Sequence, residues 1–195
     1  MTIAVGTDLA FGNIVQGRSG EAIHSCFYCQ KCTAGCPTAY LMDYKPAQLL
    51  RMIQLGQRDQ VLSSKAIWMC IGCEACGTRC PNDIRLAPVM DVLREMALDE
   101  GYEVETAIYS LHQSFLNSIK MWGRLHELTM LMEFKTRCLL KEYPVFFHGL
   151  LDDMKLGRDL IFNGKLSFVP ERIKGLEEIK ALYEEAEAAK SEVDQ

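Results

Sequence analysis

Apolar residues recur every three or four positions through most of the chain, which is the spacing of one face of an α-helix. One example begins near Pro46, a residue that suits the first position of a helix, and ends near Gly56, which suits a carboxyl-terminal cap. Its apolar face consists of Leu49, Leu50 and Ile53. Strand-like alternation is nearly absent, so the predicted fold class is all-α. The other predicted helices cover residues 58–65, 88–101, 108–122, 125–132 and 150–162.

The composition of the chain argues against a nucleic-acid-binding protein and a membrane-spanning protein. The chain has 195 residues and a formal net charge of -5, and this acidic balance argues against nucleic acid as a partner. It shows no basic leader followed by an apolar run and no apolar segment long enough for a bilayer, so the expected location is the cytoplasm. A reducing cytoplasm keeps cysteines unpaired and leaves them free to bind metal or to act in catalysis.

Eight of the nine cysteines fall into two copies of the pattern CxxCxxCxxxCP. The copies comprise Cys26, Cys29, Cys32 and Cys36 before Pro37, and Cys70, Cys73, Cys76 and Cys80 before Pro81. The pattern resembles the bacterial two-cluster ferredoxin signature, in which three cysteines of a run bind one [4Fe-4S] cluster and the fourth binds the other. The predicted ligand sets are therefore Cys26, Cys29, Cys32 and Cys80 for one cluster, and Cys70, Cys73, Cys76 and Cys36 for the other.

Two other uses of these cysteines are conceivable. A disulfide framework conflicts with a reducing compartment. Zinc sites with four cysteine ligands also use CxxC pairs, but their ligands come from two separated pairs. Each copy here instead has three cysteines at three-residue intervals. A zinc-organised interaction module is therefore the weaker alternative, and a brown colour that bleaches with dithionite would exclude it.

Residues beside the cysteines are candidates for tuning the clusters. Small residues such as Gly35, Gly72 and Gly77 let backbone amides approach the sulfur atoms. The candidates to cover the clusters from water are Phe27, Tyr28, Trp68 and Ile71. The candidates to offset the negative charge of a reduced cluster are Lys31, Arg79 and Arg85.

The remaining reactive side chains are predicted to be structural. Cys138 has no second thiol in its helical stretch and is expected to be a small buried hydrophobe. His112, His126 and His148 lack the carboxylate or histidine company of a metal site, and His24 is not needed where four cysteines serve each cluster. No glycine-rich nucleotide motif and no nucleophile elbow is present, so flavin and nucleotide sites are expected on other chains and no catalytic residue is predicted.

The predicted organisation has four parts. Residues 1–25 contain four glycines among scattered polar residues and are expected to be an irregular lead-in. Residues 26–101 form the helical ferredoxin domain with two clusters, in which each cysteine loop feeds a helix and Cys70 follows Cys26 by 44 residues. Residues 102–169 form a helical extension for packing or docking, and residues 170–195 form a charged carboxyl-terminal segment.

The runs CFYCQKCTAGCP and CIGCEACGTRCP, the helical spacer between them and the chain length resemble the C subunit of heterodisulfide reductase, a helical two-cluster ferredoxin. The match is strongest from Cys26 to Gly101, and the run from Gly164 to Gly175 is similar to the tail of that family. The resemblance implies an electron-transfer protein between a flavin-bearing, electron-bifurcating A subunit and a B subunit that reduces a disulfide. It also implies a hydrogenase or formate dehydrogenase as electron source and the mixed disulfide of coenzymes M and B as substrate.

The B subunit of such a complex carries paired cysteines in a CCG motif, whereas this chain has no adjacent cysteines, so the disulfide chemistry is not expected here. Similar two-cluster modules serve succinate and fumarate, glycolate and lactate, and glycerol-phosphate enzymes. Those usually bring a plant-type [2Fe-2S] cysteine set or a fused CCG domain, and this sequence has neither. An electron-transfer subunit of such a dehydrogenase is the alternative function.

Overall fold

The computed structural model describes residues 8, 10–102, 106–141, 155, 157–159, 162–163 and 170–193. Within these residues the secondary structure is helical and contains no strand, which confirms the predicted all-α class. The chain divides into two compact units, Met1–Glu105 and Thr106–Gln195. None of the described helices combines the length and the apolar character that a bilayer-spanning segment needs.

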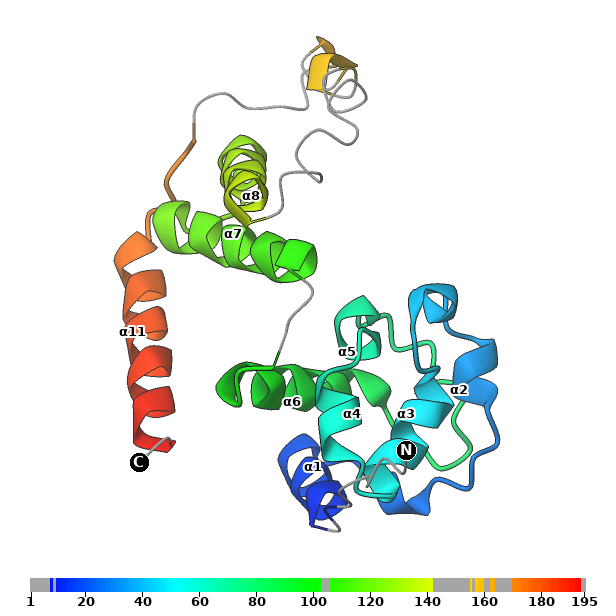
Figure 1. The fold of residues 1–195 in the computed structure, drawn as a ribbon. Helices are drawn as coiled ribbons and strands as arrows, with labels where there is room; N and C mark the ends of the chain where they lie inside the picture. The colour runs from blue at the N-terminus through cyan, green and yellow to red at the C-terminus, as the bar shows by residue number, and fades with distance from the viewer. Residues whose placement is uncertain are drawn as a thin grey trace. The chain divides into compact units, whose positions relative to one another are not determined.

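The first unit consists of short helices arranged around α6, which packs against α1, α4 and α5 (Figure 1). Helix α3 packs against α1, α2 and α4. The core between them contains Leu49 and Ile53 of α3 and Leu93 of α6, all with no exposed surface. The elements in chain order are α1 (Phe11–Ser19), η1 (Ile23–Ser25), α2 (Lys31–Ala34), η2 (Ala39–Leu41), α3 (Pro46–Gln54), α4 (Arg58–Leu62), α5 (Ala66–Met69) and α6 (Leu86–Asp99).

The helices predicted after each cysteine loop are present. Helix α3 begins at Pro46, and Gly56 follows its end in the left-handed conformation with φ of 69°. Helix α6 ends just before Gly101, which has φ of 71°. Each of these glycines adopts a backbone conformation that L side chains disfavour, which is why it terminates its helix.

Residues 11–19, expected to be irregular, form helix α1. Phe11 and Val15 have no exposed surface, and α1 packs against α3 and α6. A Cβ atom on Gly12 would lie 3.2 Å from the carbonyl oxygen of Ile53, so the glycine permits close contact between helices. Gly20, with φ of 71°, ends α1. Tertiary packing therefore forms this helix, and the prediction of an irregular segment was wrong because glycine was interpreted only as a helix breaker.

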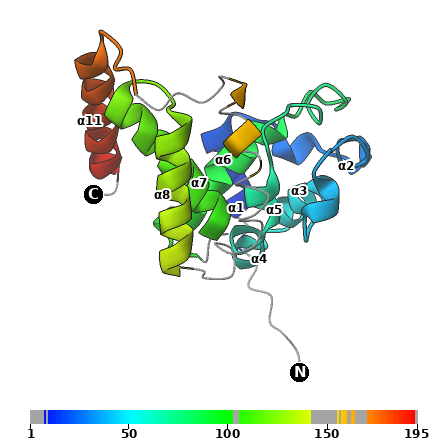
Figure 2. The ribbon, with the colours of Figure 1, turned by 90° about the horizontal axis from the view of Figure 1, so that it is seen from above.

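The second unit is built on α7 (Thr106–Trp122), which packs against α8 (Glu127–Lys141) and α11 (Leu176–Val193). Figure 2 shows α8 crossing in front of α7, with α11 beside one end of α7. The break predicted between residues 122 and 125 is confirmed, and Gly123 within it has φ of 78°. Cys138 is 1% exposed, as expected of a small buried hydrophobe. The predicted helix over residues 150–162 lies largely outside the described residues.

Candidate iron-sulfur site

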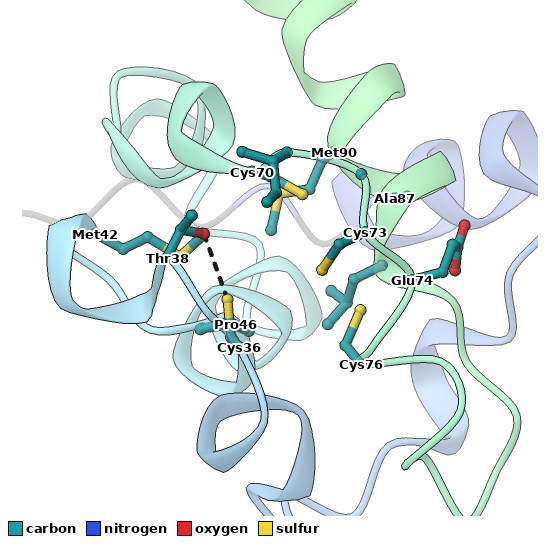
Figure 3. A pocket seen from close by; sticks show the side chains of 13 residues that line it. Cys36, Thr38, Met42, Pro46, Cys70, Cys73, Glu74, Cys76, Ala87 and Met90 are labelled. Carbon is teal, nitrogen blue, oxygen red and sulfur yellow. Dashed lines mark hydrogen bonds between the residues drawn. The ribbon is translucent and has the colours of Figure 1, made fainter.

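Four cysteines of the two motifs line a single pocket in the first unit (Figure 3). Cys36 comes from the segment after α2, and Cys70, Cys73 and Cys76 come from the loop between α5 and α6. Apolar side chains complete the walls of the pocket, namely Met42, Pro46, Leu86 and Met90. The pocket therefore combines thiol groups with an apolar lining. The apolar side chains exclude water from one side of a group bound by these thiols.

The residues around this pocket match the second predicted ligand set. Cys36 precedes Cys70 by 34 residues in the sequence, yet the two thiols lie close enough to interact electrostatically. The structure thus brings the fourth cysteine of the first motif to the first three of the second. The assignment of these residues as ligands stays a prediction.

Two segments of the first predicted ligand set are joined by a contact between residues that flank Cys26 and Cys80. The side-chain amide of Asn82 donates a hydrogen bond to the carbonyl oxygen of Ser25. Ser25 directly precedes Cys26, and Asn82 is two residues beyond Cys80. The segments that carry Cys26 and Cys80 therefore lie side by side, as crossed ligation requires.

The chemistry of the thiols in the pocket suits an iron-sulfur cluster. Within the described part of the chain, no three His, Cys, Asp or Glu side chains are close enough to hold one metal ion together. A [4Fe-4S] cluster is bound differently, because each thiolate ligates a different iron atom and the thiolates surround the whole cluster. Four thiols around an apolar pocket are the soft donor set that iron-sulfur clusters take.

The two cysteine loops repeat one backbone conformation. Tyr28 and Gln30 have φ angles of 62° and 63°, and Gly72 and Glu74, each 44 residues further on, have 63° and 58°. Left-handed residues among right-handed ones turn successive backbone N–H groups toward one side and form a concavity that binds anions, as at many iron-sulfur sites. Each loop therefore contains the left-handed residues from which such a concavity is built.

Backbone amides also hydrogen-bond to three half-buried thiols. They donate from Thr33 to Cys32, from Gly72 to Cys70, and from Gly77 and Leu86 to Cys76. Burial raises the pKa of all three of these thiols, and the amide donors oppose that rise. Because a cysteine must lose its proton to bind metal, the donors favour the form that ligates.

Two carboxylates that carry no signal in the sequence fix the loops in place. Asp43 accepts hydrogen bonds from the backbone N–H groups of Lys65 and Ala66, both at 2.9 Å, and so caps the short helix α5 that leads into the second motif. Glu21 is 5% exposed and accepts from the backbone N–H of Arg85 at 2.8 Å and from its Nε at 2.9 Å. Local pattern could not reveal these partners, because they lie 22 to 64 residues away.

The residues expected to cover the clusters divide into two groups. Phe27 is 64% exposed, Ile71 66% and Tyr28 39%. Ile71 also lines the pocket that contains Cys36, Cys70, Cys73 and Cys76, and the covering role of these three residues stays a prediction. Phe27 and Ile71 each follow the first cysteine of a motif, where the loop runs along the surface. Trp68, just before the second motif, is 4% exposed and belongs to the core.

The basic residues expected near the clusters have different surroundings. Arg85 forms an ion pair with Glu21 at 2.8 Å. The Arg79 side chain lies over Gly35 in the first motif, and Lys31 is exposed. Two further donors that the sequence did not reveal, Gln54 of α3 and Arg94 of α6, bind backbone carbonyls at the start of each motif.

His24 and His126 take part in local structural contacts. The ring of His24 hydrogen-bonds through Nε2 to Oδ1 of Asn13 at 3.0 Å. His126 is 7% exposed, and its Nδ1 lies 2.7 Å from Oγ1 of Thr129. His148 lies outside the described residues.

Comparison with known proteins identifies the domain. Residues 25–85 match a family model described as a 4Fe-4S dicluster domain. These residues contain all eight motif cysteines. The chain therefore carries a 4Fe-4S dicluster domain, whose cofactors are two [4Fe-4S] clusters.

The chain is also similar to components of one kind of complex. It is 41% identical over 86 residues to the C subunit of the ferredoxin:CoB-CoM heterodisulfide reductase of Methanosarcina acetivorans. The aligned region covers 44% of this chain and 34% of that protein. It is 30% identical over 95 residues to the C subunit of the H(2):CoB-CoM heterodisulfide,ferredoxin reductase of Methanothermobacter marburgensis. That aligned region covers 49% of this chain and 51% of that protein. The chain thus spans about half or less of the length of these relatives. It is an iron-sulfur protein that resembles the C subunit of heterodisulfide reductase.

Proposed function

We propose that this chain is the iron-sulfur electron-transfer subunit of a heterodisulfide-reductase-type complex. It would relay single electrons from a flavin-containing, bifurcating subunit to a disulfide-reducing subunit of the CCG type. The observation that carries the proposal is the pocket in which Cys36 of the first motif lies with Cys70, Cys73 and Cys76 of the second. Motifs interlocked in this way hold two redox centres inside one small unit.

The proposed ligand sets are Cys26, Cys29, Cys32 and Cys80 for one cluster, and Cys70, Cys73, Cys76 and Cys36 for the other. When bound, the clusters supply one-electron storage. The chain's own residues supply thiolates, direct backbone amides toward sulfur and exclude water with the apolar wall around Met42, Leu86 and Met90. These are the features by which a protein sets a cluster's reduction potential.

Surface exposure at both motifs supports a relay. Cys29 and Cys73 occupy equivalent positions and are both exposed, and each lies near an exposed apolar residue, Phe27 or Ile71. Each cluster site therefore reaches the surface, where a partner can exchange electrons with it. The chain has no adjacent cysteines of the CCG kind, so we assign the disulfide chemistry to the partner and no substrate chemistry to this chain alone.

The proposed partners in heterodisulfide reductase are its A subunit, a flavoprotein, and its B subunit, a CCG protein, joined in a larger complex by a hydrogenase or formate dehydrogenase. The motif cysteines form no disulfide, which suits the reducing cytoplasm as the location of this complex. The alternative is an electron-transfer subunit of another dehydrogenase, of the succinate or fumarate, glycolate or lactate, or glycerol-3-phosphate type.

Anaerobic purification of the tagged full chain from its host tests the proposal. We expect about eight irons and eight sulfides per polypeptide, the content of two [4Fe-4S] clusters. We also expect a flavoprotein and a CCG protein to co-purify. Iron far below this content would overturn the cofactor assignment, and co-purification with a different dehydrogenase would favour the alternative function.

Cysteine variants test the relay itself. Replacing Cys32 or Cys76 with serine should remove one cluster's EPR signal and stop turnover of the complex, while substrate affinity on the neighbouring subunit is unchanged. The matched control is Cys138→Ala, because Cys138 is a cysteine outside both motifs and is 1% exposed. This control should keep both EPR signals. Full turnover in Cys76→Ser would contradict the proposed electron path.

A further inference from the structure

One side chain tethers the start of each cysteine motif, and the two tethers occupy equivalent places. Gln54, the last residue of α3, donates from Nε2 to the carbonyl oxygens of Ile23 at 2.9 Å and Cys26 at 3.2 Å. Arg94 of α6 donates from Nε to the carbonyl oxygen of Ile67 at 2.6 Å and from Nη2 to that of Cys70. In both motifs the acceptors are therefore the first cysteine and the residue three positions before it.

The surrounding backbone follows the same repeat. The short helix η1 ends at Cys26 with φ of -70° and ψ of 118°, and the short helix α5 ends at Cys70 with φ of -73° and ψ of 121°. Carbonyl groups at a helix end have few donors within the helix, and here a side chain from the helix after the motif supplies a donor to each of two carbonyls. The two tethers differ in charge, because one is a neutral amide and the other a guanidinium.

The charge of Arg94 is held in a partly desolvated place. Its side chain is 17% exposed, and its carboxylate partner Asp91, at 3.0 Å, is 71% exposed. An exposed carboxylate is screened by water and offsets only part of the guanidinium charge. Glu74 lies half-buried on the wall of the pocket and acts in the opposite direction. The Arg94 charge also acts on the Cys70 thiol directly.

We propose that Arg94 is a positioning residue that raises the reduction potential of the cluster held by Cys70, Cys73, Cys76 and Cys36. Reduction adds a negative charge to a cluster, and a fixed positive charge nearby stabilises the reduced form. Gln54 fulfils the same hydrogen-bonding role at the first motif without this charge. The two clusters, although bound by the same motif, are thereby made inequivalent. The inference rests on the ligand sets of the proposed function.

An EPR-monitored redox titration of the anaerobic full chain tests this inference. In Arg94→Gln, which places the first motif's neutral amide at the second, the potential of one cluster should fall. We expect the ratio of reduced to oxidised cluster at fixed ambient potential to fall about tenfold, which is about 59 mV for a one-electron couple. The affected signal should be the one that Cys76→Ser removes. The other cluster should keep its potential.

Two further variants separate charge from geometry. Arg94→Lys keeps the positive charge and loses the two-pronged donor, so it should retain most of the wild-type potential. Arg18→Gln is the matched control, because Arg18 is an arginine that pairs with Glu95 of α6 on the surface, 39% exposed, and its loss should leave both potentials unchanged. If the Arg94→Gln protein does not retain its cluster, the Arg94→Lys titration tests the inference, which requires a potential close to that of the wild type.

The outcomes are distinct. Unchanged potentials in an Arg94→Gln protein with full iron content would overturn the inference and leave the proposed function standing. An equal fall in Arg94→Lys and Arg94→Gln would overturn it too, because geometry rather than charge would then set the potential. A wild-type chain without about eight irons would overturn the proposed function first, and this inference with it.

Discussion

The side chain of Arg79 lies directly over Gly35, so that a Cβ atom on Gly35 would approach the Cδ of Arg79 to 2.5 Å. The two residues hold the same position in their motifs, each immediately before the fourth cysteine. This contact joins the two motifs at equivalent points. The close contact between the two motifs beside Cys36 is therefore favoured by the absence of a side chain at position 35.

Gly35→Ala should destabilise the first unit by about 1 kcal/mol, since the new methyl group displaces the Arg79 side chain. In an Arg79→Ala background the same substitution should cause a smaller loss, because the displaced atoms are gone. A double-mutant cycle on midpoints of anaerobic urea denaturation measures this coupling. Gly17→Ala is the control: a Cβ there meets nothing within 4 Å, so helix propensity should make it neutral or stabilising. Equal losses in both backgrounds would show that the contact carries no energy.

The helices that could be predicted from the sequence are those with local signals. Pro46 begins α3 and Gly56 follows it, and the apolar face of Leu49, Leu50 and Ile53 is buried. Helix α1 has a weaker signal, because only Phe11, Ile14 and Val15 follow helical spacing and the helix contains two glycines. Its stability comes from packing against α3 and α6, and a local pattern does not contain that information.

The same division applies to the site. Spacing alone predicts the eight cysteines as cluster ligands, since one loop must supply three ligands at three-residue intervals. The groups that hold the loops were not found, because Asp43, Gln54 and Arg94 bind segments 22 to 31 residues away through ordinary polar side chains. Such partners become visible only when the fold brings them together.

Asp43→Ala should destabilise the first unit by about 1 kcal/mol, the usual effect of removing a helix cap. Both carboxylate oxygens of Asp43 accept a backbone N–H at the start of α5. Asp43→Asn keeps one acceptor oxygen and should lose about half as much. The denaturation midpoint measures the loss of stability. The rate at which air bleaches the visible absorption measures the effect on the cluster, because α5 leads into the second motif. A fully stable Asp43→Ala would mean that water caps α5 equally well.

Gly72→Ala should cost about 1 kcal/mol although a Cβ there meets nothing within 4 Å, because φ of 63° is disfavoured for residues with a side chain. Tyr28 occupies the equivalent position of the first motif with φ of 62°, so the loop conformation accepts a side chain. Both clusters should therefore be retained. Iron analysis and the denaturation midpoint test the two parts of this prediction separately, and loss of iron would show that the space above Gly72 is needed.

Tyr102 should titrate at unusually high pH. Its hydroxyl donates a hydrogen bond to Oδ1 of Asp59 at 2.6 Å, and this bond, followed by burial, raises the pKa of Tyr102 to about 12. Because the folded-state pKa lies above the ordinary value of 10.0, the hydrogen bond contributes its full stability below pH 10 and loses it as the pH rises through 10 toward 12. Absorbance of ionised tyrosine near 295 nm should show one late transition that Tyr102→Phe removes. In Tyr102→Phe the fall in stability over that pH range should also be smaller, and an unchanged late transition would assign it to another tyrosine.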